Sequence, residues 1–182
     1  MIDYILHING RGGSGKTTLI KMLNERLGLE KTRNFTTRKP RFKGESDYHF
    51  VTEETFVEYF KQSKIIECYY KDSSRALYGT AAPEKTGIYQ SEVVALVALR
   101  KWCFEHKVPF LSIYLDIDTQ VLLARLKKRS DSNETPDERL EEDEYYEIFK
   151  HWSDIVYDYN NITVEQAVED IIGMMRGAGL IS

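Results

Sequence analysis

The sequence has few cysteines and no long apolar run, and both shortages exclude classes of protein. Its two cysteines, Cys68 and Cys103, have no further Cys or His at metal-ligand spacing, which argues against a disulfide framework and a zinc site. The longest strictly apolar run covers residues 93–99, whereas a membrane-spanning helix needs about 20 apolar residues. The N-terminus carries Asp3 and His7 instead of the basic, then apolar pattern of a signal peptide. We therefore expect a cytoplasmic protein without a membrane partner.

An excess of positive charge is also lacking. The chain has 25 Lys and Arg against 29 Asp and Glu, a formal net charge of −4, so nucleic acid is not expected as a partner. Only four prolines occur, and no Pro/Ser-rich linker interrupts a composition that is ordinary for a globular protein. At 182 residues, the chain is expected to form one domain with a small insertion.

Strand-like apolar segments alternate with helix-like ones, which predicts an α/β fold with a parallel sheet flanked by helices. The candidate buried strands are residues 2–8, 87–90, 110–115 and 155–157. The stretch 33–80 is instead rich in Thr, Arg, Tyr and short alternating segments, and we interpret it as a β-rich insertion. Residues 1–32 and 81–182 would then form the core.

Two helix starts have clear capping signals. Thr163 and Gln166 have the spacing of a capping box, and the apolar residues that follow stay on one helix face, so this helix is expected to pack on the sheet. Thr135 and Pro136 have the pattern of an N-cap followed by a first helical residue, which places Arg139 in a first helical turn.

Residues 10–17, GRGGSGKT, form the strongest motif in the chain. They match G-x-x-x-x-G-K-[ST], follow an apolar strand and precede an apolar-periodic helix, which is the context of a phosphate-binding P-loop. The glycines allow backbone N–H groups to converge on phosphate oxygens, Lys16 adds a positive charge, and Thr17 offers a hydroxyl to Mg²⁺. The motif therefore predicts ATP and Mg²⁺ as cofactors. The residues expected to bind ATP here are Gly10, Arg11, Gly12, Gly13, Ser14, Gly15, Lys16, Thr17 and Thr18.

A second anion site is predicted within the insertion. Arg38 and Arg41 flank Pro40, which would stiffen the segment and keep two guanidinium groups in a fixed relation suited to a phosphate. Tyr48 and Tyr78 could donate their hydroxyl groups to the same phosphate.

In these motifs the sequence resembles the guanylate kinase family. The matching segments are GRGGSGKT at 10–17, TTRKPR at 36–41, GESDYHFV at 44–51, Ile66-Glu67 and Tyr78-Gly79-Thr80. Weaker matches follow in order at 126–129, Arg139-Leu140 and Asn160-Asn161. The resemblance thus spans nearly the whole chain.

The resemblance implies a nucleoside monophosphate kinase that converts ATP and GMP, or dGMP, to ADP and the diphosphate. It implies a core sheet of about five strands, a monophosphate-binding subdomain at 33–80 and a lid at about 127–139. Glu67 and Thr80 would face the guanine base, and Asn161 would lie on the adenine side. Arg129 and Arg139 would neutralise charge on the transferring group, as catalytic groups beside Lys16. The full implied substrate set is Asn34, Arg38, Arg41, Tyr48, Glu67, Tyr78, Thr80 and Glu92.

The match also has departures. Asn34 stands where the family usually has a serine near the base, and Glu45 falls one position later than expected. Where the family has an acidic LDxD strand, this sequence reads Ile88-Tyr89-Gln90-Ser91-Glu92, and a neutral Gln90 supplies no negative charge near Mg²⁺. The departures bear on base preference and on magnesium affinity.

Two alternatives remain open at this point. A kinase of the same fold could act on another phosphorylated acceptor such as a ribose phosphate, which Glu67 and Thr80 argue against. A guanylate-kinase-like domain could also be a catalytically weak nucleotide-binding or protein-binding module, which the intact Lys16 argues against. Monomer and homodimer are both compatible with the sequence.

Overall fold

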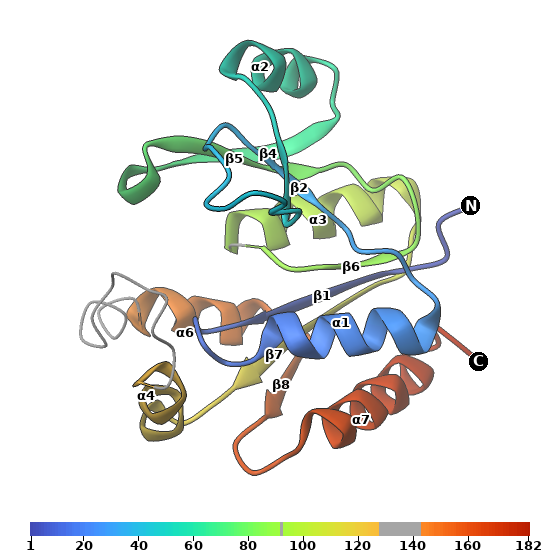
Figure 1. The fold of residues 1–182 in the computed structure, drawn as a ribbon. Coiled ribbons are helices and arrows are strands. Elements are labelled where there is room, and N and C mark those ends of the chain that lie inside the picture. Colours follow the sequence, from blue (N-terminus) through green and yellow to red (C-terminus); the bar gives the residue numbers. More distant parts are fainter. Residues whose placement is uncertain (92, 128–142) are drawn as a thin grey trace.

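The protein contains two β-sheets. The computed structural model describes residues 1–91, 93–127 and 143–182 (Figure 1). Within these residues, the core sheet has four parallel strands in the order β6-β1-β7-β8. They are β1 (Ile5–Gly10), β6 (Gly87–Tyr89), β7 (Phe110–Asp116) and β8 (Ile155–Asp158). These are the strands located by the apolar pattern; the expected number of about five came from the resemblance alone and is one too many for the described part of the chain.

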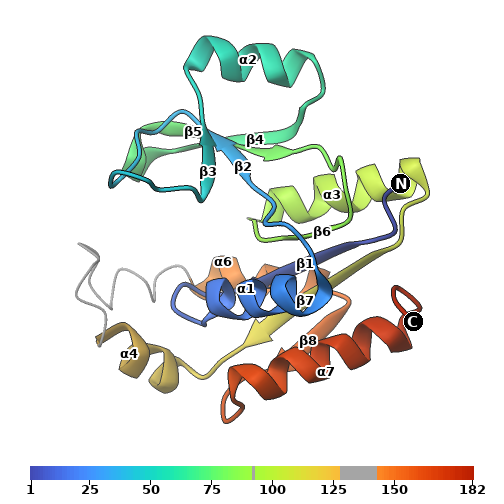
Figure 2. The ribbon, with the colours of Figure 1, turned by 45° about the vertical axis from the view of Figure 1, so that its right-hand side comes forward.

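Helices cover both faces of the core sheet, which explains why β1 is buried along its whole length (Figures 1 and 2). Leu6 and Ile8 of β1 share one cluster with apolar side chains of α1 (Lys16–Leu27) and α7 (Val164–Gly177). Ile5 packs on the other face, in a cluster with Leu99 of α3 (Val93–His106). Leu96 of α3 belongs to a further cluster with Phe149 of α6 (Asp143–Trp152), and α4 (Thr119–Lys127) follows β7.

The helix predicted from Thr163 is confirmed. Thr163 is the N-cap of α7, and its side chain and that of Gln166 form the reciprocal hydrogen bonds of a capping box. Its buried residues are Ala167, Val168, Ile171, Ile172 and Met175. This apolar face fixes α7 against the core sheet, beside α1.

The second sheet confirms the β-rich character of the insertion. Its strand order is β3-β2-β5-β4, with β2 and β3 parallel and the other pairs antiparallel. The elements are β2 (Asn34–Thr36), β3 (Tyr48–Phe50), α2 (Glu53–Lys61), β4 (Ile65–Lys71), the short 3₁₀ helix η1 (Asp72–Ser74) and β5 (Ala76–Ala81). Figure 2 shows this sheet as a layer separate from the core sheet, with α2 on the side turned away from the core.

Some sequence predictions lie outside the described residues. These are Glu92, Arg129, Arg139, the helix start at Thr135 and nearly all of the lid expected at about 127–139.

Within the described residues, no helix combines the length and the apolar character needed to cross a membrane.

Packing of α2 on the second sheet depends on a glycine. A Cβ at Gly79 would lie 2.6 Å from both Ile65 Cγ2 and Phe56 Cζ, and those two side chains are buried. We predict that Gly79→Ala lowers the free energy of unfolding by about 1–3 kcal/mol through overpacking.

Gly173→Ala is the matched control, because a Cβ at this helical position meets no atom within 4 Å. It should raise stability by about 0.5–1 kcal/mol through helix propensity. Urea unfolding measures both variants. Equal stability of Gly79→Ala and the wild type would contradict the packing argument.

Candidate functional site

The glycine-rich loop lies where the sequence predicts it, between the end of β1 and the start of α1. Gly15 is the N-cap of α1 with a φ of 96°, a left-handed conformation that disfavours a side chain. Gly10 lies so close to β7 that a Cβ would come within 2.9 Å of the Leu115 carbonyl oxygen. The two glycines allow the loop to turn tightly at the carboxyl edge of the core sheet.

Lys16 folds back onto this loop. Its Nζ donates to the carbonyl oxygens of Gly10 and Arg11 at 2.5 and 2.7 Å, and lies 3.3 Å from the Ser14 hydroxyl. The Arg11 side chain turns away instead, and its guanidinium donates to Thr119 Oγ1 at 3.0 Å, at the start of α4. The backbone carbonyl of Arg11 therefore holds Lys16, and the side chain of Arg11 anchors the loop to α4.

A cavity of about 700 Å³ joins the loop to the second sheet. Its walls come from the loop and one face of α1, from the end of β6, and from the second sheet. The predicted site residues that line it are Gly10, Gly12, Lys16, Thr17, Asn34, Arg38, Arg41, Tyr48, Tyr78 and Thr80. The fold thus brings both predicted anion sites to a single space.

Other predicted residues are not brought into this space. Thr18, Asn161 and Glu67 are absent from the described residues that line the cavity, although Glu67 contacts Thr80, which does line it. Gly13, Ser14 and Gly15 belong to the loop but do not line the cavity. Glu92, Arg129 and Arg139 cannot be placed, because they lie outside the described residues.

Arg38 is held by a buried carboxylate. Its guanidinium forms a two-pronged ion pair with Glu45, at 2.9 and 2.5 Å, and the two side chains are only 8 % and 3 % exposed. Glu45 also accepts from the Arg41 backbone N–H at 2.6 Å. The Arg38 guanidinium lies over the rings of Tyr48 and Phe50, about 5 Å from each centroid, which adds cation–π attraction.

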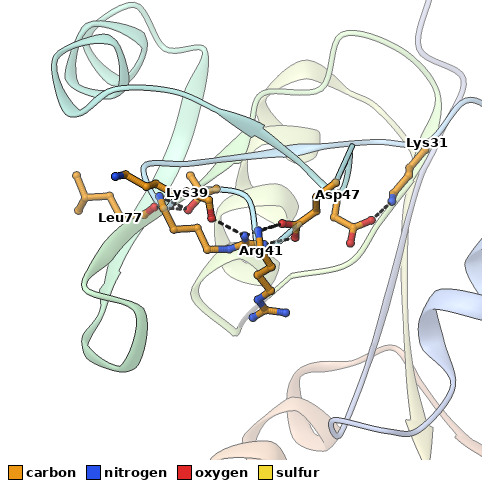
Figure 3. A network of polar contacts seen from close by, with 8 residues as sticks. Lys31, Lys39, Arg41, Asp47 and Leu77 are labelled. Carbon is orange, nitrogen blue, oxygen red and sulfur yellow. Dashed lines mark hydrogen bonds and ion pairs between the residues drawn. The ribbon is translucent and has the colours of Figure 1, made fainter. Parts of the chain in front are cut away.

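These contacts fix the segment from Arg38 to Glu45. The hydrogen bonds from Arg38, with further help from the Arg41 N–H, hold the pKa of Glu45 at about 2. Figure 3 shows the Arg41 side chain extending away from this network, toward the side on which the core lies. Lys31 and Asp47 form a second ion pair beside these contacts (Figure 3).

Aromatic rings support the Arg38 side of the cavity. Tyr78 meets Tyr48 edge to face at 5.6 Å, and stacks on Tyr69 with ring centroids 5.5 Å apart. Tyr69, like Lys31 and Lys71, lines the cavity without having been predicted. The signal available for Tyr69 and Lys71 was their alternation with Glu67 along one strand, which places all three on one face of β4.

Glu67 and Thr80 meet across β4 and β5, where they are paired in register. The buried Thr80 hydroxyl donates to Glu67 Oε2 at 3.0 Å. The Thr80 hydroxyl therefore has its proton in a hydrogen bond within the protein, and this hydrogen bond orients the Glu67 carboxylate.

Asn34 joins the second sheet to the core. Its amide oxygen accepts from the Ala81 N–H at 3.2 Å, and its amide nitrogen donates to the Gln90 carbonyl oxygen at 3.4 Å. Its polar atoms thus bridge the backbone at the ends of β5 and β6.

Sequence reasoning also missed a polar chain beneath the loop. His7 contacts both Asn9 and Ser91, and the latter two line the cavity. The available signal was a histidine in the middle of an apolar strand.

A central parallel strand that ends in a glycine-rich loop and leads into a helix defines a P-loop protein. The matching family model, described as an AAA domain, covers residues 6–149. The guanylate kinase of Fusobacterium nucleatum is 30 % identical over 178 residues, which span 93 % of this chain and 94 % of that protein. The guanylate kinase of Chlamydia felis is 31 % identical over 154 residues, or 77 % of this chain and 72 % of that protein.

The fold agrees with these sequence matches. The crystal structure of guanylate kinase from Anaplasma phagocytophilum superposes with a TM-score of 0.64 at 21 % identity, over 97 % of this chain and 86 % of that one. The chain belongs to the guanylate kinase family.

The buried ion pair gives a test by pH. A carboxyl pKa lowered from about 4.5 to about 2 stabilises the fold above pH 4.5, and this contribution is lost as the pH falls toward 2. Glu45→Gln, which leaves Arg38 buried without its counter-charge, should lower the free energy of unfolding by about 3 kcal/mol at pH 7. The difference from the wild type should shrink between pH 5 and pH 2, as followed by urea unfolding.

Glu169→Gln serves as the control, because Glu169 pairs with Arg26 on the exposed surface. It should change stability by less than about 1 kcal/mol. A Glu45→Gln deficit that stays constant down to pH 2 would contradict the assignment.

Proposed function

We propose that the chain transfers the terminal phosphate of ATP to a nucleoside monophosphate, with GMP or dGMP as the acceptor. One observation carries the proposal: a single cavity has Lys16 and Thr17 on one wall and Arg38, Arg41 and Tyr78 on the other. Two anion sites that face each other in one space suit a reaction between two phosphorylated substrates.

The loop would hold the donor. Its backbone N–H groups and the N-terminus of α1 favour phosphate, and Lys16 would exchange its carbonyl contacts for phosphate oxygens. Thr17 lines the cavity, and its hydroxyl is an oxygen ligand of the kind that Mg²⁺ prefers, so this residue fits the ion. When bound, Mg²⁺ would neutralise part of the phosphate charge.

The second sheet would hold the acceptor phosphate. Arg41 is exposed to the cavity, and Arg38 and Tyr78 line the same wall. Glu45 and the Lys39 carbonyl oxygen hold the Arg38 guanidinium in position. The clamp is therefore built before the substrate arrives, which lowers the entropic cost of binding.

Glu67 would select the base. Its carboxylate, oriented by Thr80, can accept from the N1–H and the amino group of guanine, whereas adenine presents an acceptor at N1. Thr80 thus acts on the base through Glu67 in this proposal. A base that leaves a buried carboxylate unpaired costs a few kcal/mol, which is enough for strong discrimination.

The reaction needs no covalent intermediate, because phosphoryl transfer depends on positioning and charge neutralisation. Arg129 and Arg139 stay in the proposal as cations of a lid at about 127–139, on the strength of the resemblance. Residues 33–80 are proposed as the monophosphate-binding subdomain, joined to a core of residues 1–32 and 81–182.

The proposal predicts ADP formation from ATP and Mg²⁺ with GMP and dGMP, and not with AMP, CMP, UMP or ribose phosphates. Lys16→Ala should reduce kcat by at least about 100-fold, because it removes a charge from the transferring phosphate. Lys101→Ala, on the exposed face of α3, is the control and should retain wild-type turnover. A coupled ADP assay measures all three proteins.

The acceptor panel separates the alternatives. Turnover with a ribose phosphate would refute the assignment of Glu67 to a base. Absence of turnover with every acceptor would refute the kinase and favour a nucleotide-binding or protein-binding module.

A variant of Glu67 tests base selection separately. Glu67→Gln keeps the shape of the side chain and an oxygen for Thr80, but loses the paired acceptors for guanine. We expect kcat/KM for GMP to fall about 100-fold, while the KM for ATP stays unchanged. Glu58→Gln on α2 is the control, because Glu58 pairs with Gln62 on the exposed surface. An unchanged kcat/KM for GMP in Glu67→Gln would remove Glu67 from base recognition.

A further inference from the structure

His7 is a polar residue in the interior of an apolar strand. It lies in the middle of β1 and is 0 % exposed. Its ring stacks near Phe110, and the charged groups that face it are Arg100 of α3 and Asp154, which precedes β8. Burial, and secondarily the Arg100 charge, lower the pKa of His7 to about 3, so the ring is neutral at physiological pH.

The neighbours of His7 define which ring nitrogen carries the proton. Asn9 Nδ2 lies 3.1 Å from His7 Nδ1, and an amide nitrogen can only donate, so Nδ1 is the acceptor. The proton of the neutral ring is then on Nε2, which donates to Ser91 Oγ at 2.8 Å. The Ser91 hydroxyl is thereby oriented by His7 and keeps its own proton for a further acceptor.

Strand register places this hydroxyl beside the glycine-rich loop. β6 runs parallel to β1 with Tyr89 opposite His7, so Ser91 follows the end of β6 close to Asn9 and Gly10. Ser91 and Asn9 line the same cavity as Lys16 and Thr17. The hydroxyl therefore lies at the edge of the sheet where the phosphates of a nucleotide would be held.

Ser91 is preceded by the neutral Gln90 and followed in the sequence by Glu92. The side chains of Gln90 and Ser91 carry an amide and a hydroxyl, and both groups can donate to a phosphate oxygen. A hydrogen-bond donor that is already oriented stabilises the charge on a transferring phosphoryl group more than a donor that must first be ordered.

We propose that Ser91 donates a hydrogen bond to the terminal phosphate of bound ATP, and that His7 and Asn9 are positioning residues that aim this hydroxyl. The inference rests on the proposed use of ATP and adds to it a contact specific to the phosphate that is transferred. It does not depend on which acceptor the chain uses.

Binding of ATP and ADP to the full chain tests the contact, because only ATP carries the terminal phosphate. We expect Ser91→Ala to raise the Kd for ATP about tenfold in titration calorimetry and to leave the Kd for ADP within about twofold of the wild type. kcat should fall by about tenfold or more. Equal changes in the two Kd values, or none, would overturn the proposal.

Thr86→Ala is the matched control, because it removes a hydroxyl at the opposite end of β6, where Thr86 bonds Asp3. It should leave both Kd values unchanged.

A double-mutant cycle tests the positioning role of His7. His7→Leu should reproduce the selective loss of ATP affinity, and the double variant with Ser91→Ala should lose no more than either single variant. His7→Gln keeps an N–H donor and should recover part of the ATP affinity, and it provides the test if His7→Leu does not fold. His7 variants with wild-type ATP and ADP affinities would remove His7 from the proposal.

The wild-type chain distinguishes this inference from the proposed function. ATP binding without turnover of any acceptor would refute the kinase and leave the Kd comparison as the test of Ser91. A wild-type chain that does not bind ATP would overturn both.

Discussion

The site depends on holding several cations close together before any substrate neutralises them. Lys16, Arg38 and Arg41 share one cavity, and their mutual repulsion would disperse flexible side chains. Internal acceptors prevent this: Lys16 bonds to the loop carbonyl groups, and Glu45 pairs with Arg38 in a buried position. The carbonyl contacts of Lys16 can be exchanged for phosphate oxygens, whereas the Glu45 pair stays as the frame of the clamp. The positive potential is thus ready for two phosphorylated ligands.

The fold divides the two anion sites between two sheets. The core sheet carries the loop at the end of a strand that is buried on both faces, so the loop has a rigid base. The second sheet carries the arginines and the Glu67–Thr80 pair, and Asn34 ties it to the backbone at the ends of β5 and β6. This division gives each substrate its own scaffold and makes the reacting groups meet between them.

Local patterns predicted most of this fold. The four core strands, the capping box at Thr163 and the loop at 10–17 were visible because each depends on residues close in sequence. The contact between His7 and Ser91, 84 residues apart, was not visible, because it depends on the register of β1 with β6. The contacts of the Asn34 amide with the backbone of Ala81 and Gln90 were not visible either, because they depend on how the two sheets meet. Asn34 also lines the cavity, and its place near the base stays a prediction from the resemblance. The pairing of Glu45 with Arg38 likewise required the folded loop.

A crystal structure of the chain with ADP and GMP would show whether the two anion sites hold the phosphates of the two nucleotides. We expect the β-phosphate of ADP in the loop, with Lys16 Nζ moved from the Gly10 and Arg11 carbonyl groups to phosphate. We expect the GMP phosphate on Arg38 and Arg41, with Glu45 still paired to Arg38, and the guanine edge on Glu67. A GMP phosphate bound away from Arg38 and Arg41 would refute the phosphate clamp, and a guanine with no contact to Glu67 would refute base selection by this residue.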